Sequence, residues 1–163
     1  MKKILMLILI SIVLFILDNA FVPFLNIKTI CPSLLFVFMV SYSIVSGKYE
    51  VLWLGIFTGM LQDIYFIDGF WVNTFVNMIV SMFAVFIGNS IFKEKKFIPV
   101  VSCFFLSVAK GMIIFLILLI AGIHVSVMNM LFTGIYNMIL CIFMYNAVYR
   151  LCKINYMKTE WKF

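Results

Sequence analysis

Six long apolar runs, separated by short polar breaks, cover most of the chain. A helix needs about 20 apolar residues to cross the hydrocarbon core of a bilayer, and most of these runs approach that length. The pattern predicts helices over about 4–25, 30–46, 51–67, 70–92, 98–121 and 125–149. The first run lacks a pair of small residues for cleavage, so we expect a retained helix rather than a signal peptide.

The third run carries two glycines and a carboxylate through an otherwise apolar segment. Gly55, Gly59 and Asp63 are four residues apart, so they share one face of a helix. Small residues at this spacing let two membrane helices approach closely, and Ala84 and Gly88 repeat the spacing in the fourth run. These five residues therefore predict a helix-packing or partner-binding face, with the third helix central in the bundle.

Composition makes lipid the expected solvent. Apolar residues make up 66% of the chain and charged residues only 11%, and the mean hydropathy is +1.23. Soluble domains are about half apolar and about a quarter charged. The fold class predicted is an all-α integral membrane protein, a compact bundle of six transmembrane helices forming a single transmembrane domain over 1–163. Its last part, 150–163, is a short basic tail.

Charge predicts the orientation in the cytoplasmic membrane. If the amino terminus is cytoplasmic, inner segments hold ten basic residues and outer segments only Lys28. The ten are Lys2, Lys3, Lys48, Lys93, Lys95, Lys96, Arg150, Lys153, Lys158 and Lys162. This bias follows the positive-inside rule and predicts six crossings with both termini inside. It also explains the net charge of +6 without nucleic acid, which we exclude as a partner.

Polar side chains within the runs fall at a common depth. Counted from the inner ends of their helices, Asp18, Asp63 and Lys110 lie at similar depth, and Asn77 and Asn137 can reach the same layer. A lone ammonium inside a membrane is costly, so we expect Lys110 to pair with Asp63 or Asp18. The simplest role for this buried polar layer is to hold the helices together. A transport or binding role is the alternative.

No pattern in the sequence predicts catalysis. The only histidine, His124, falls in a predicted turn without neighbouring metal ligands, so neither a metal site nor a cofactor is expected. Nucleophile elbows and glycine-rich phosphate loops are missing from the sequence as well. The four cysteines are not placed as an obvious disulfide pair.

Short motifs across the chain resemble the rod shape-determining MreD family. They are Pro32-Ser33-Leu34-Leu35, Gly47, Gly55, Gly59, Leu61-Gln62-Asp63, Gly69 and Tyr136-Asn137. The resemblance implies a non-enzymatic membrane subunit of the bacterial cell elongation machinery. Such proteins bind MreC and work with RodA and a class B penicillin-binding protein, and they help couple MreB filaments, indirectly, to peptidoglycan synthesis. Lys110 is not part of that pattern.

The alternative is a substrate-binding subunit of an energy-coupling-factor vitamin transporter. These subunits are also compact six-helix proteins, for which a similar fold is expected. Asp18, Asp63 and Asn77 would then line a ligand pocket. Against this hypothesis, such subunits commonly carry Ala-x-x-x-Ala on the first helix, where this chain has only Ala20. An ion carrier is a third possibility, but the internal repeat typical of carriers is missing.

Overall fold

The computed structural model describes residues 2–21, 24, 32–46, 51–65, 71–90, 97–120, 122 and 127–153. This part of the chain forms six helices. They are α1 (Lys2–Ala20), α2 (Leu34–Ser46), α3 (Leu52–Tyr65), α4 (Val72–Ser90), α5 (Phe97–Ile120) and α6 (Val127–Cys152). All six correspond to the predicted apolar runs.

Three boundaries differ from those predicted. Helix α1 ends at Ala20 rather than near 25, because Pro23 disfavours helical backbone at the residue before it. Helix α6 continues to Cys152, three residues into the segment predicted as a tail. Helix α2 begins at Leu34 rather than near 30, because Pro32 and Ser33 precede the helix. The end of the third run lies outside the described residues.

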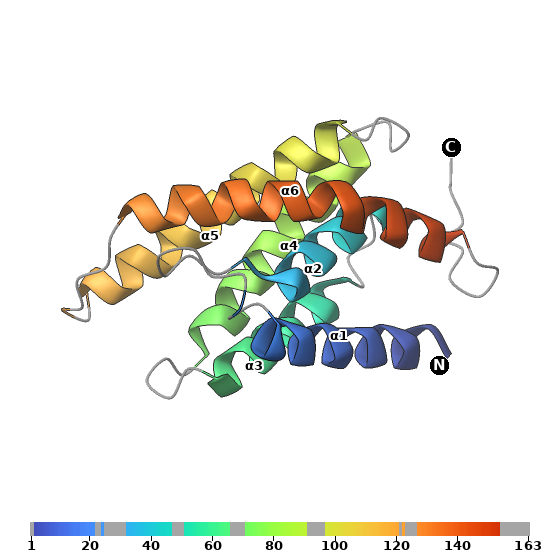
Figure 1. Cartoon of the computed structure of the whole chain (residues 1–163), viewed down its shortest axis with the longest axis horizontal. Coiled ribbons are helices and arrows are strands. Elements are labelled where there is room, and N and C mark those ends of the chain that lie inside the picture. Colours follow the sequence, from blue (N-terminus) through green and yellow to red (C-terminus); the bar gives the residue numbers. More distant parts are fainter. Residues whose placement is uncertain are drawn as a thin grey trace.

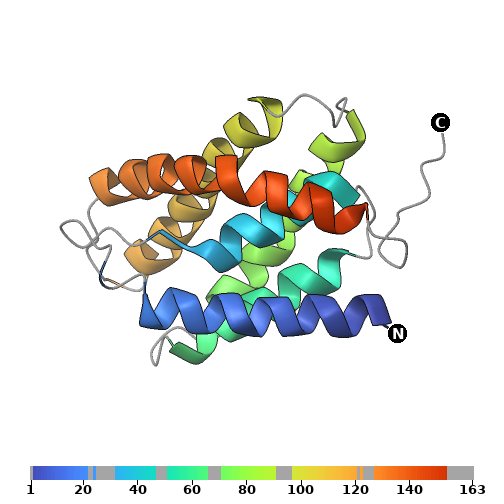
Figure 2. The same cartoon turned by 45° about the vertical axis from the view of Figure 1, so that its right-hand side comes forward.

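The helices pack as two close pairs around a central helix. Helices α3 and α4 form one pair, and α5 and α6 form the other. Helix α2 lies between α4 and α6, and α1 covers α2 and α3 on the remaining side (Figure 1). The same order is visible after the molecule is turned (Figure 2).

The central helix is α2, not α3. Every residue from Leu35 to Ser46 is buried, and α2 packs against all the other helices. By contrast, α3 exposes Trp53 and Ile64, with 77% and 73% of their surface accessible. The prediction of a central third helix is therefore wrong. Gly55 and Gly59 bring α3 close to α4. Part of the α3 surface stays exposed, so the glycines do not make it the central helix.

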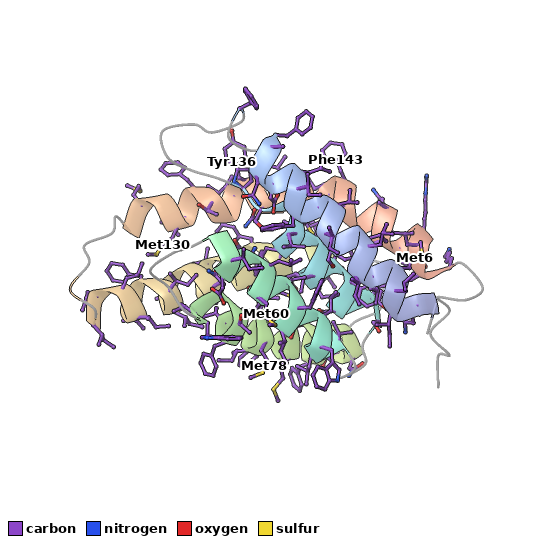
Figure 3. All side chains as sticks on the ribbon, turned by 90° about the horizontal axis from the view of Figure 1, so that it is seen from below. Met6, Met60, Met78, Met130, Tyr136 and Phe143 are labelled. Atoms are coloured by element: carbon purple, nitrogen blue, oxygen red, sulfur yellow. The ribbon has the colours of Figure 1, made fainter. Side chains whose placement is uncertain are left out.

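Helix length and apolarity identify a membrane protein. Within the described residues, α1, α4, α5 and α6 are long and apolar enough to cross a bilayer. Apolar side chains spread outward around the bundle, among them Phe143 (Figure 3), which is 72% exposed. The central helix differs from these four. With 13 residues, α2 is about 20 Å long, shorter than a hydrocarbon core of about 30 Å.

The predicted small-residue face binds helices of the same chain. A Cβ atom at Gly55 would lie 2.6 Å from Ser81 Oγ of α4. A Cβ at Gly59 would collide with the backbone of Thr74, also in α4. On α4, Ala84 is fully buried and Gly88 lies against the backbone of Ile44 in α2. The glycines therefore hold α3, α4 and α2 together.

We expect Gly59→Ile to lower the free energy of unfolding by about 1–3 kcal/mol or more, because the new side chain meets backbone that cannot move aside. The control, Met60→Ile, places the same side chain at the exposed neighbouring position. Chemical unfolding in bicelles measures both variants. Equal stability of the two variants would show that α3 and α4 are not in this close contact.

Candidate functional site: a polar network at the start of the central helix

The first turn of α2 is capped by a carboxylate from another helix. Asp18, near the end of α1, accepts hydrogen bonds from the backbone N–H groups of Leu34 at 2.7 Å and Leu35 at 3.0 Å. The hydroxyl of Ser33 also donates to Asp18, at 3.0 Å. A carboxylate at a helix N-terminus is further stabilised by the helix dipole. Asp18 thus fixes the C-terminal end of α1 to the start of α2.

The remaining N–H groups of this turn have side-chain partners as well. Phe36 N–H donates to Ser33 Oγ at 3.2 Å, the usual contact of an N-cap serine. Ser33 N–H donates to Oδ1 of Asn137, on α6, at 3.0 Å. A helix leaves its first four N–H groups without partners inside the helix, and here all four are satisfied by side chains.

Two amides and an ammonium extend the network to the other helices. Gln62 of α3 donates to Ser33 Oγ at 3.1 Å, and Asn77 of α4 donates to Gln62 Oε1 at 3.0 Å. Lys110 Nζ, from α5, donates to Gln62 Oε1 at 2.6 Å and to Asn77 Oδ1 at 2.9 Å. The ammonium also lies 4.8 Å from the ring centroid of Phe36. Residues of all five other helices thus meet around the start of α2.

A second carboxylate caps a second helix. Asp63 of α3 accepts hydrogen bonds from Asn73 N–H at 2.9 Å and Thr74 N–H at 2.8 Å, in the first turn of α4. The hydroxyl of Thr74 donates to the same carboxylate at 2.6 Å. Because Gly59 lies one turn earlier and touches Thr74, the glycine brings the helices close enough for this cap.

The structure brings together most of the predicted polar layer. Asp18, Asn77, Lys110 and Asn137 belong to one connected network, whereas Asp63 forms its own cluster at α4. The expected direct pairing of Lys110 with a carboxylate is corrected: its hydrogen bonds go to two amides. Both carboxylates instead accept hydrogen bonds from helix N-termini.

Comparison with known proteins agrees with this architecture. The family model described as rod shape-determining protein MreD matches residues 1–155. The chain belongs to the MreD family. Membership implies a non-enzymatic role in rod-shape determination, as a component of the elongation machinery in the inner membrane. No curated protein and no solved structure matches the chain.

Three members of the network in this MreD-family chain were not among the predicted site residues. They are Ser33, Gln62 and Ser107, which accepts a hydrogen bond from Asn137 Nδ2 at 2.7 Å. Two of them had a signal in the sequence: a serine before an apolar run is a typical N-cap, and Gln62 lies beside Asp63. Ser107 had none, because serine is common inside membrane helices.

The network has the chemistry of a structural support. Its donors and acceptors satisfy one another, so Asp18, Asp63 and Asn77 do not present free acceptors as the transporter hypothesis requires. Among the described residues, no three potential metal ligands gather in one place. Cys103 and Cys141 carry free thiols, while His124 and Cys31 lie outside the described residues.

A double-mutant cycle tests the corrected partner of Lys110. We expect Lys110→Met and Gln62→Leu to show a coupling energy of about 0.5–3 kcal/mol in the free energy of unfolding, because each removes the other's partner. Lys110→Met with Asn146→Ala is the control, since Asn146 bonds within α6 and the two changes should be additive. Additivity of Lys110→Met with Gln62→Leu would contradict the observed contact.

Proposed function

We propose that this chain binds MreC within the membrane and thereby helps couple MreB filaments to peptidoglycan synthesis by RodA and a class B penicillin-binding protein. The observation that carries the proposal is the match of the MreD family model to residues 1–155. The polar network supports the proposal, because every helix is joined to another by a side-chain hydrogen bond. The bundle can therefore present a stable surface to a partner.

The internal use of the small-residue face limits where a partner helix can bind. Gly55 and Gly59 pack on α4, and Gly88 packs on α2, so these positions are not available to another protein. Partner helices must therefore contact the outward faces, which are apolar and face lipid in the absence of a partner. In lipid such contacts depend on close packing rather than on the hydrophobic effect.

We also propose that α2 and α3 complete six crossings, with both termini in the cytoplasm. The start of α1 and the end of α6 lie at the same end of the bundle (Figure 1). Lys3, Arg150 and Lys153 belong to these two segments. Placing that end in the cytoplasm follows the positive-inside rule and leaves the polar network in the outer half of the membrane.

Site-directed photocrosslinking tests the binding of MreC. A benzophenone amino acid replaces one outward phenylalanine at a time: Phe83, Phe105 or Phe143, each more than half exposed. We expect an adduct with MreC from at least one of these faces in living cells. Phe38, a phenylalanine buried in α2, is the control position and should give none. Depletion of the chain should round the cells.

The absence of adducts from every outward face, together with normal rods after depletion, would overturn the proposed function. If the cells become round but no adduct forms, the role in cell shape is supported and direct binding to MreC is contradicted. The wild-type chain expressed from a second copy must restore the rods, because this shows that the rounding is caused by loss of this protein.

Reporter fusions test the orientation. Green fluorescent protein fused after Phe163 should fluoresce and alkaline phosphatase at that position should be inactive, because the tail is cytoplasmic in the proposed topology. The opposite pattern is expected for fusions after Lys28. An active phosphatase after Phe163 would contradict the topology.

A further inference from the structure

A lateral pocket opens between α1 and α3, away from the polar network. Its volume is about 530 Å³, within the range of small-molecule sites. The lining is almost entirely apolar and includes Leu7 of α1, Leu54 and Phe57 of α3. The side chains at its edge include Ile4 and Trp53, 63% and 77% exposed, so the pocket opens towards the surrounding lipid.

The lining includes an ammonium and a hydroxyl, from Lys3 and Ser46. Lys3 belongs to the first turn of α1, where an ammonium can reach the membrane surface. Ser46, the last residue of α2, is only 3% exposed, and its hydroxyl has no hydrogen-bond partner among the described residues. A buried hydroxyl without a partner is rare in a native protein, and it suggests that a polar group is supplied from outside the chain.

A ligand that fits this lining has an anionic group, a neutral hydrogen-bond acceptor and a long apolar body. A phospholipid carries these groups in that order: a phosphate, ester carbonyls and acyl chains. We propose that the pocket binds one anionic phospholipid of the cytoplasmic leaflet, with its phosphate beside Lys3, an ester carbonyl accepting from Ser46 and an acyl chain in the cavity. The leaflet depends on the proposed orientation; the binding does not.

Fluorescence quenching by brominated lipids tests this proposal on the full chain. In a variant with Trp71→Phe and Trp161→Phe, Trp53 at the pocket edge is the reporter. The protein is reconstituted in phosphatidylcholine with either brominated phosphatidylglycerol or brominated phosphatidylcholine as quencher. We expect phosphatidylglycerol to bind about fivefold more tightly than phosphatidylcholine. This is the size of effect that one basic residue at the membrane surface gives.

Matched variants separate this site from general attraction to the membrane. Lys3→Gln should abolish the preference, whereas Lys2→Gln, which removes the same charge from the adjacent position, should retain most of it. Ser46→Ala should weaken binding of phosphatidylglycerol. Ser43→Ala is its control, because the Ser43 hydroxyl already donates to Met39 O within α2. Leu7→Phe, which fills part of the cavity without adding a second tryptophan, should weaken the preference by displacing the acyl chain.

Equal quenching by the two lipids in the otherwise unaltered chain would overturn the proposal. So would equal effects of Lys2→Gln and Lys3→Gln, which would indicate attraction to surface charge only. Weak quenching by both lipids would also overturn it, because it would show that lipid does not enter the pocket. None of these outcomes bears on binding of MreC, so this proposal and the proposed function can fail separately.

Discussion

The structure depends on satisfying the first turn of the helix at the centre of the bundle. Helix α2 is about 20 Å long, is buried from Leu35 to Ser46 and packs against all five other helices, so the N–H groups of its first turn need partners within the bundle. Each unsatisfied group there would cost several kcal/mol. Asp18, Ser33 and Asn137 supply the missing acceptors from three parts of the chain. The short central helix is stable only because its neighbours complete it.

The same requirement orders the rest of the bundle. Ser33 is positioned by Gln62, Gln62 by Asn77 and Lys110, and each of these lies on a different helix. Small residues then set how closely the helices approach, so that side chains as short as those of Asp63 and Thr74 can meet. Polar groups and glycines are thus used inside the molecule. Its outer faces remain apolar and open to lipid and to partner helices, as suits a non-enzymatic component of the elongation machinery.

Much of this could be predicted from the sequence because the bilayer imposes strong rules. The six helices follow from the lengths of the apolar runs, and the inward position of Asp18, Asn77 and Lys110 follows from the cost of charge and amide groups in lipid. The enclosure of α2 could not be predicted, since a run of Phe, Val and Met suits lipid and protein equally well. Depth could be counted along each helix, whereas the direction of a side chain around its helix could not. The partner chosen by Lys110 depends on that direction.

The capping of α2 by Asp18 can be measured directly. Solid-state NMR on the chain in bilayers, with the side-chain carboxyl carbon of aspartate and the backbone nitrogen of leucine isotopically labelled, reports the distances from the Asp18 carboxyl carbon to the nitrogens of Leu34 and Leu35. Asp18→Asn identifies the signal. The hydrogen bond of 2.7 Å predicts a carbon–nitrogen distance of about 3.5 Å and strong dipolar dephasing. A distance too long for any hydrogen bond would contradict the account of the central helix.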